Sequence, residues 1–259
     1  MIGFIFTLNK LNMYNEYNTQ SYLDANVADQ SVVKDFMART FLWMAGALAI
    51  TSIVCFVLMS NQSLMLNFFD MQTGRTNILG KIVMFAPLLF VLTMSFAYNK
   101  LNTIAMAALF VVYAAINGVT FSFILMAYTQ SSILGAFVGA ASMFAVMAVM
   151  GYTTKTDLTS FGRIMMMGLI GMLVMSLVNM FMGSDTMSYV IGLIGVAVFT
   201  GLTAYDVQKL KNMAAGIDAN GDTLVVESTR KLAIYGALTL YLDFINLFLS
   251  LLRVFGRRD

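Results

Sequence analysis

The chain has 259 residues, of which 59% are hydrophobic and only 11% are charged, whereas roughly 25% of residues carry a charge in an average soluble protein. The formal net charge is +2, and no run of Lys and Arg with interleaved aromatic residues occurs, so nucleic-acid binding is not expected. The chain has no histidine and one cysteine, Cys55, which excludes Ser-His-Asp and Cys-His catalysis, histidine-based zinc sites and an intrachain disulfide.

The first residues predict a tail that precedes the membrane domain. Residues 1–35 are mostly polar, and we expect them to form a flexible cytoplasmic tail, followed by a transmembrane domain over residues 36–259. The apolar stretch at the start is only about six residues long and has no basic region before it, so a secretory signal is not expected. Both Met1 and Met13 fit as the native start.

Seven runs are apolar and long enough to cross a membrane, for which about 20 residues are needed. They cover residues 41–60, 79–98, 103–127, 132–153, 163–183, 187–208 and 231–254. The sequence therefore predicts an all-α integral membrane protein with seven transmembrane helices, for which the lipid bilayer is the first partner.

Basic residues are distributed unevenly between the two sides of these predicted spans. The richer set consists of Lys34, Arg39, Lys100, Lys155, Arg163, Lys209, Lys211, Arg230 and Lys231. Because basic residues favour the cytoplasmic side, the N-terminus is predicted to be cytoplasmic. Seven spans would place Arg253, Arg257 and Arg258 on the opposite side, so the side of the C-terminus stays open.

The last predicted span, which contains YLDFINLFLSLLRVF, carries a polar stripe. Its members are three or four residues apart and therefore share one helix face: Thr239, Asp243, Asn246, Ser250 and Arg253. A charge at the centre of a membrane helix costs at least about 2.5–3.5 kcal/mol, so this face should avoid lipid. We expect the C-terminal helix to be central and surrounded by the other six. A purely structural role for Asp243 is the alternative.

Other polar residues allow two readings. Asp206, in GLTAYDVQKLK, lies less than one turn before Lys209, so it is either a helix-end residue paired with a lysine or part of a site. Asn117 and Thr120 share a face of the third span. They either form interhelical hydrogen bonds of about 1 kcal/mol each or line a polar path.

One loop resembles the start of a calcium-binding EF-hand. In DANGDTLVVE, Asp218, Asn220 and Asp222 have the required spacing, but Thr223 stands where the loop needs glycine and Thr229 where it needs glutamate. We therefore expect a polar turn and no calcium site in this loop. No cofactor is predicted.

The segments GLTAYDVQKLK and LYLDFINLFLSLLR resemble the Bax inhibitor-1 family, also called the transmembrane Bax inhibitor motif family, in its bacterial YccA/YetJ-like branch. The resemblance covers about residues 35–256 and is specific in these two motifs. It implies a seven-helix protein of the bacterial cell (inner) membrane that acts as a pH-sensitive calcium leak channel. It also implies that Asp206 and Asp243 share a proton near the cytoplasmic side and form the pH sensor and gate.

Further roles follow from this resemblance. An arginine near the end of the second helix bonds to the pair in one state of the family, and the nearest residue here is Lys100, a weaker latch because lysine is a point charge. When ionised, Asp206 and Asp243 would offer oxygens to Ca²⁺. The predicted path lining is Thr239, Asn246, Ser250, Asn117 and Thr120.

The carboxyl pair imposes a condition on the helices that carry it. Asp206 lies near the inner end of its predicted span, whereas Asp243 is about 18 Å of helix beyond Lys231. The two residues can meet only if the sixth and seventh helices are offset along their axes, and we predict such an offset.

The alternative function is a binding role without transport. Proteins of this branch are linked to a membrane-embedded AAA protease as substrates and modulators, and residues 13–35 would be the handle for it. An enzyme is not expected, because an aspartyl intramembrane protease pairs a YD motif with GxGD, whereas Leu242 precedes Asp243.

Overall fold

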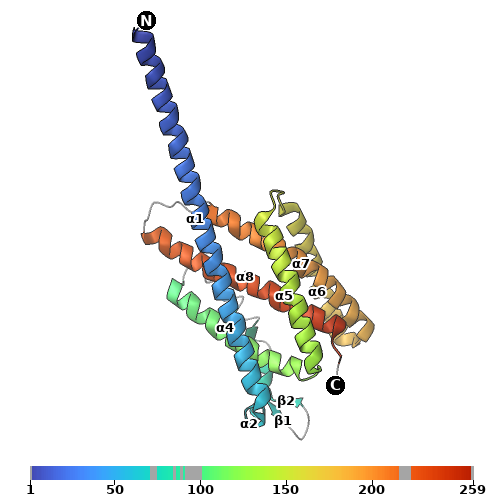
Figure 1. Cartoon of the computed structure of the whole chain (residues 1–259). Helices are drawn as coiled ribbons and strands as arrows, with labels where there is room; N and C mark the ends of the chain where they lie inside the picture. Colours follow the sequence, from blue (N-terminus) through green and yellow to red (C-terminus); the bar gives the residue numbers. More distant parts are fainter. Residues whose placement is uncertain are drawn as a thin grey trace.

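The computed structural model describes residues 2–70, 75–83, 86–87, 90, 101–215 and 223–257. The helices are α1 (Ile2–Ser60), α2 (Gln62–Met65), α4 (Thr103–Leu125), α5 (Gln130–Thr153), α6 (Thr159–Met182), α7 (Asp185–Ala215) and α8 (Thr223–Phe255). Residues 78–83, 86–87 and 90 are also helical. Two short strands, β1 (Phe69–Asp70) and β2 (Arg75–Thr76), pair in antiparallel orientation (Figure 1).

Six helices in the described part of the chain are long and apolar enough to cross a membrane. They are Gln30–Ser60, Thr103–Leu125, Gln130–Thr153, Thr159–Met182, Asp185–Ala215 and Thr229–Phe255. Each of them coincides with one of the predicted spans. The remaining predicted span, residues 79–98, falls largely outside the described residues, so the count of seven helices stays a prediction.

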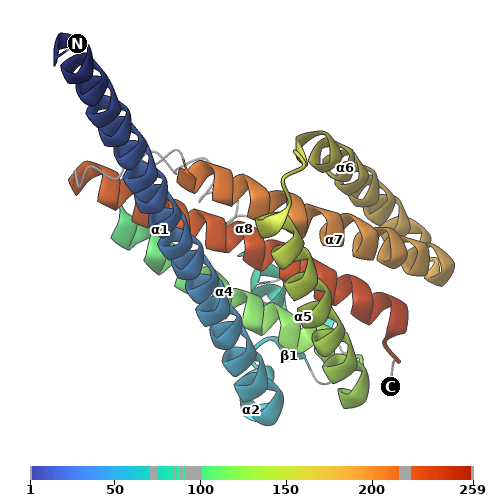
Figure 2. The ribbon, with the colours of Figure 1, turned by 45° about the horizontal axis from the view of Figure 1, so that its top comes forward.

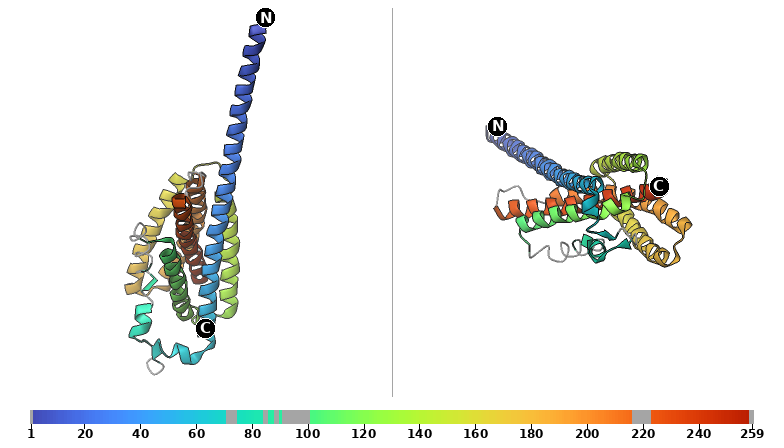
Figure 3. Two further views of the ribbon diagram at one scale, coloured as in Figure 1. Left: turned by 90° about the vertical axis from the view of Figure 1, so that its left-hand side faces the viewer. Right: turned by 90° about the horizontal axis from the view of Figure 1, so that it is seen from below.

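Helix α1 is continuous from Ile2 to Ser60, and its N-terminal half extends well beyond the other helices (Figure 3). Only the part from Gln30 onward has the hydropathy of a membrane span. The described backbone shows no break near residue 35, so the boundary between tail and membrane domain stays a prediction.

Short connections join α4, α5, α6 and α7 in turn, and of these consecutive pairs α6 and α7 pack against each other. The side chain of Asn102 caps the start of α4 by accepting a hydrogen bond from the backbone of Ala105, and Thr129 does the same for α5. Gly183 ends α6 in the left-handed conformation, with φ of 64°, which glycine adopts without steric cost.

Helix α8 packs against α1, α4, α5 and α7, whereas α6 packs against α7 at the edge of the bundle (Figure 2). In the most apolar window of α8, 67% of the residues are buried, while none is buried in that of α6. The helix with the polar stripe is therefore the most buried of the six described spans. That six helices surround it stays a prediction.

Candidate functional site

The site is built from two carboxyl groups on neighbouring helices. Asp206 of α7 and Asp243 of α8 are hydrogen-bonded to each other through their side chains. Ionised carboxylates only accept hydrogen bonds, so a bond between two carboxyl groups requires a proton on one of them. The structure thus brings the two predicted carboxyl groups together, and their sharing of a proton stays a prediction.

The Asp243 carboxyl group is buried, so its protonation state affects the stability of the structure. Asp243 is only 5% exposed, and its Oδ2 atom has no hydrogen-bond partner among the described residues. An ionised carboxylate that is buried without donors loses its hydration and gains little in return. We therefore expect a hydrogen held between oxygens of Asp206 and Asp243 to compensate for the burial of Asp243.

The close approach of α7 and α8 depends on two glycines. Gly195 lies against the side chain of Ser250, and a Cβ atom there would collide with the Ser250 Oγ. A Cβ atom on Gly192 would come within 2.8 Å of the Val254 Cγ2 and 3.4 Å of the Arg253 Cβ. Because the polar stripe of α8 meets these positions, it faces α7.

The two helices are offset along their axes. Gly192 lies beside Val254, next to the last residue of α8, whereas α7 begins at Asp185, about 10 Å of helix further on. At the other end, Gly236 lies against Leu210, and α8 begins well beyond the end of α7. The observed offset is the one that lets Asp206 and Asp243 meet.

A different face of α7 is fixed by the connection between α5 and α6. The Gln208 side chain accepts a hydrogen bond from the Leu158 backbone N–H (2.8 Å) and donates one to the Thr156 carbonyl (2.7 Å). The Lys211 Nζ donates to the carbonyl of Tyr152 at 2.7 Å. These hydrogen bonds attach the helical turn of α7 that follows Asp206 to the end of α5 and to the α5–α6 connection.

The neighbouring lysines make contacts other than an ion pair with Asp206. The Lys209 Nζ lies 5.8 Å from the centre of the Tyr205 ring, and that of Lys211 lies 5.3 Å from the centre of the Tyr152 ring. Lys209 is also close enough to Asp206 for an electrostatic interaction, so both readings of Asp206, as a residue paired with lysine and as part of a site, stay open.

The other stripe residues bond within their own helix. The Thr239 Oγ1 donates to the Tyr235 carbonyl at 3.2 Å, and the Asn246 Nδ2 to the Leu242 carbonyl at 2.8 Å. The Ser250 Oγ donates to the Asn246 carbonyl at 2.7 Å. These residues follow the α7–α8 interface, and their role as a path lining stays a prediction.

Asn117 and Thr120 lie on α4, away from the α7–α8 interface. The Asn117 Nδ2 donates to the Tyr113 carbonyl at 3.1 Å, and the Thr120 Oγ1 donates to the carbonyls of Ile116 at 3.1 Å and Val83 at 3.2 Å. Helix α4 reaches α8 through the rings of Phe110 and Tyr113, which contact Tyr241.

Tyr241 and Asp243 are two residues apart, so they point to opposite sides of α8. The structure therefore does not bring Asn117 and Thr120 together with the carboxyl pair.

A buried contact between α1 and α8 was not predicted from the sequence. The hydroxyls of Thr51 and Tyr241 are 2.8 Å apart, and the Thr51 Oγ1 also donates to the Ala114 carbonyl at 2.8 Å. Both residues carry a hydroxyl within a predicted membrane span, where a polar group needs a partner, and this was the signal that could have indicated a buried contact.

Some predicted residues cannot be placed in the site. Lys100, Asp218, Asn220, Asp222 and Arg258 lie outside the described residues. Among the described residues, no group of three or more His, Cys, Asp or Glu side chains is arranged to hold a metal. The role of Asp206 and Asp243 as calcium ligands stays a prediction.

Comparison with known proteins identifies the family. The family model described as "Inhibitor of apoptosis-promoting Bax1" matches residues 33–259. The chain is 43% identical over 235 residues to "Inner membrane protein YbhL" of Escherichia coli (strain K12), covering 91% of this chain and 97% of that protein. It is 40% identical over 228 residues to an uncharacterized protein of Deinococcus radiodurans, covering 88% of this chain and 92% of that protein.

A third relative is "Uncharacterized protein RP147" of Rickettsia prowazekii, 40% identical over 228 residues that cover 87% of this chain and 91% of the relative. The match to the family model extends over nearly all of the chain that follows residue 33, including both aspartate motifs. The resemblance read from these motifs is thus confirmed, and the chain belongs to the Bax inhibitor-1 family of membrane proteins.

Proposed function

We propose that the protein is a pH-sensitive calcium leak channel of the cell membrane, gated by the proton that Asp206 and Asp243 share. The observation that carries this proposal is the hydrogen bond between their carboxyl groups, at the interface of two membrane-spanning helices. The resemblance to the Bax inhibitor-1 family implies the same function.

The proposed arrangement has seven helices around a central α8, with the N-terminus in the cytoplasm. The burial of α8 and its packing against four other helices support the central position. The name of YbhL, an inner membrane protein of Escherichia coli, supports a location in the inner membrane of a bacterial cell.

The gate depends on how many charges the pair carries. Two unit charges about 4 Å apart repel each other by about 4 kcal/mol at an effective dielectric constant of about 20. A single interhelical hydrogen bond contributes about 1 kcal/mol or less in a membrane. When the shared proton is lost, the repulsion between Asp206 and Asp243 therefore exceeds the energy of a few interhelical hydrogen bonds. Loss or gain of this proton thus changes the packing of α7 on α8.

The path follows the polar stripe between α7 and α8. In the described state, Asn246 and Ser250 use their donors within α8, and Ser250 packs against Gly195, so the interface is closed at this level. A shift of α7 exposes the oxygens of these side chains to a passing ion. The ionised pair then offers further oxygens to Ca²⁺, which is the cargo and not a resident cofactor.

The experiment follows calcium flux into liposomes that contain the purified protein, over a range of pH values around neutrality. Asp206→Asn and Asp243→Asn should each flatten the dependence of flux on pH, because an amide cannot take part in the exchange of the shared proton. Asp35→Asn is the matched control, since Asp35 is exposed on α1, outside the two helices that carry the pair. If both site variants keep the profile of the unmodified protein, the gating mechanism is wrong.

A second candidate is a modulator of a membrane-embedded AAA protease, without transport activity. The observation that favours it is the N-terminal part of α1, which extends beyond the bundle and precedes the family match at residue 33. Removal of residues 13–32 should abolish binding to the protease and leave calcium flux unchanged. Binding that survives this deletion would exclude the tail as the handle.

A further inference from the structure

A cavity of about 630 Å³ lies between α1, α4, α5 and α8, on another side of α8 from the α7 contact. Its floor is formed by Phe244, Ile245 and Phe248 of α8. Helices α1 and α5 both pack on α8 but make little or no contact with each other (Figure 2). Side chains of both helices line the cavity and form its two walls. None of the side chains that line the cavity is charged.

The cavity is open toward the outside of the bundle. Phe56 of α1 and Leu134 of α5, which both line it, are 72% and 64% exposed. In a membrane-spanning domain, this outer surface contacts the hydrocarbon of the bilayer. An occupant can therefore enter sideways from the lipid, without any movement of α8.

The length and polarity of the cavity match one leaflet of the bilayer. Its wall on α1 runs from Leu48 to Ser60, about 18 Å of helix, and half of the hydrocarbon core is about 15 Å thick. Ser60 is the last residue of α1 and Gln130 is the first of α5, so these two exposed polar side chains lie together at one end. Near the Leu48 end, Thr51 and Ser52 also line the cavity, but their hydroxyls donate to the Ala114 and Leu48 carbonyls.

We propose that this cavity binds one acyl chain of a phospholipid from the leaflet at which α1 ends, with the headgroup near Ser60 and Gln130. A uniformly apolar floor accommodates the chain, and the amide and hydroxyl at the end give the headgroup hydrogen-bonding partners. The proposal does not depend on ion transport, so the site can be tested without any measurement of flux.

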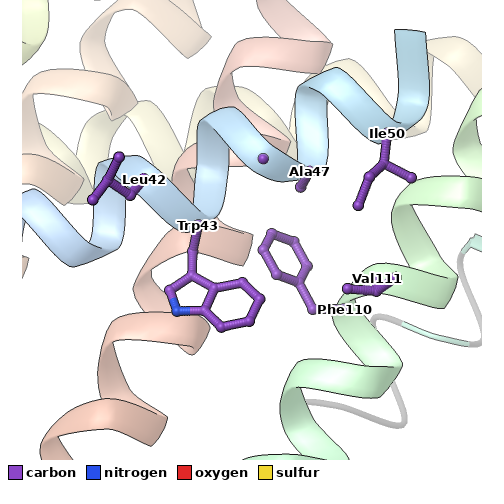
Figure 4. Close-up of a pocket in the computed structure, with 7 residues that line it drawn as sticks. Leu42, Trp43, Ala47, Ile50, Phe110 and Val111 are labelled. Carbon is purple, nitrogen blue, oxygen red and sulfur yellow. The ribbon is translucent and has the colours of Figure 1, made fainter. Parts of the chain in front are cut away.

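A second, smaller cavity lacks the features that indicate a phospholipid site. It has a volume of about 240 Å³ and lies beside Trp43 and Phe110, between α1 and α4 (Figure 4). Only apolar side chains and the backbone at Gly46 line it, with no polar end for a headgroup. We assign no ligand to this smaller cavity.

The first experiment maps lipid contacts in the full chain. The protein is placed in phospholipid nanodiscs that include a phospholipid with a photoactivatable diazirine in the middle of one acyl chain, and cross-linked peptides are identified by mass spectrometry. Cross-links to Phe137 and Phe248 in the cavity should exceed those to Ile53, a lipid-facing residue outside it, several-fold. Cross-links spread evenly over the exposed apolar residues, or cross-links at the cavity to a second copy of the chain, would overturn the proposal.

A pair of adjacent variants sharpens the test. Ser52→Trp places a large ring in the cavity, whereas Ile53→Trp places the same ring on the neighbouring lipid-facing surface. Ser52→Trp should reduce cross-linking at Phe248 several-fold, and Ile53→Trp should leave it unchanged. Equal effects of the two variants would contradict a specific site.

The unmodified chain provides a measurement that needs no variant. Cys55 is the only cysteine in the sequence and lines the cavity. Its labelling by a membrane-permeant maleimide should be several-fold slower in phospholipid nanodiscs than after delipidation in a short-chain detergent. Equal labelling rates in the two environments would show that no acyl chain covers Cys55 and would overturn the proposal.

Discussion

Thr51 and Tyr241 are 190 residues apart in the sequence, yet their hydroxyl oxygens are 2.8 Å apart in the interior of the bundle. Tyr241 is fully buried, and the rings of Phe110 and Tyr113 pack edge-on against it. This hydrogen bond ties α1 to α8, while the carboxyl pair on the opposite side of α8 ties it to α7. The C-terminal helix is thus held by polar contacts on two sides.

Tyr241→Phe should lower the free energy of unfolding by about 1 kcal/mol, because it removes one buried hydrogen bond and preserves the ring. The Thr51 Oγ1 keeps its bond to the Ala114 carbonyl, so no donor is left unpaired. Denaturation in detergent micelles measures the effect. Tyr189→Phe is the control, since Tyr189 is 47% exposed on α7, and a loss equal to that of Tyr241→Phe would contradict the assignment.

Glycine positions give a second prediction. Gly195→Ala should destabilise the protein by about 1–3 kcal/mol, because the added methyl group overpacks the contact with Ser250. The same variant should alter the pH profile of calcium flux by moving α7 away from α8. Gly135→Ala is the matched control, because no atom lies within 4 Å of the position of its Cβ. A neutral Gly195→Ala would show that the helices are not closely packed there.

Gln208 is expected to position the part of α7 that carries Asp206. Gln208→Ala removes two hydrogen bonds to the α5–α6 connection and should cost about 1–3 kcal/mol, since the Leu158 N–H loses its described partner. We expect calcium flux to keep a dependence on pH but to shift along the pH axis. A profile that coincides with that of the unmodified protein would limit Gln208 to a role in stability.

Asp157 provides a prediction for acid conditions outside the membrane. Hydrogen bonds from the Thr159 hydroxyl and then from the Thr159 backbone N–H hold the pKa of Asp157 below its usual value. Because this pKa is lowered on folding, the stabilisation is present above the ordinary aspartate pKa and is lost as pH falls through the lowered value. Asp157→Ala should lower the Tm at neutral pH, and the difference should disappear in acid. A difference that does not change with pH would contradict this account.

The transmembrane helices were the predictable part of the fold. Long apolar runs have few alternatives in a bilayer, because every backbone polar group must be satisfied within the segment. The spacing of the polar residues predicted a face of α8 that avoids lipid, and Asp243 and Ser250 are buried, whereas Arg253 at the end of the stripe is exposed. What spacing could not indicate is which neighbour this face meets, since that depends on the approach of α7 at Gly192 and Gly195.

Contacts between distant helices were the unpredictable part. Asn117 and Thr120 share a face of α4, as predicted, but α4 packs on the side of α8 that carries Tyr241. Thr51 was one hydroxyl in an apolar run, and its partner is set by the relative heights of α1 and α8. Rotation and height of a helix are three-dimensional quantities that hydropathy along a single chain does not contain.

In the proposed gate, the position of the carboxyl pair makes it an electrical as well as a chemical element. Asp243 lies about 21 Å of helix from Thr229 and about 18 Å from Phe255, and Asp206 lies about 14 Å of helix from Ala215, so both carboxyl groups lie inside the spans of their helices. A proton that reaches the pair from either surface crosses part of the transmembrane potential, and a full crossing corresponds to about 2.3 kcal/mol per 100 mV. If the proposed gate is correct, membrane voltage and bulk acidity act on the same hydrogen, and we expect an energised cell and a depolarised one to populate its two states differently at equal pH.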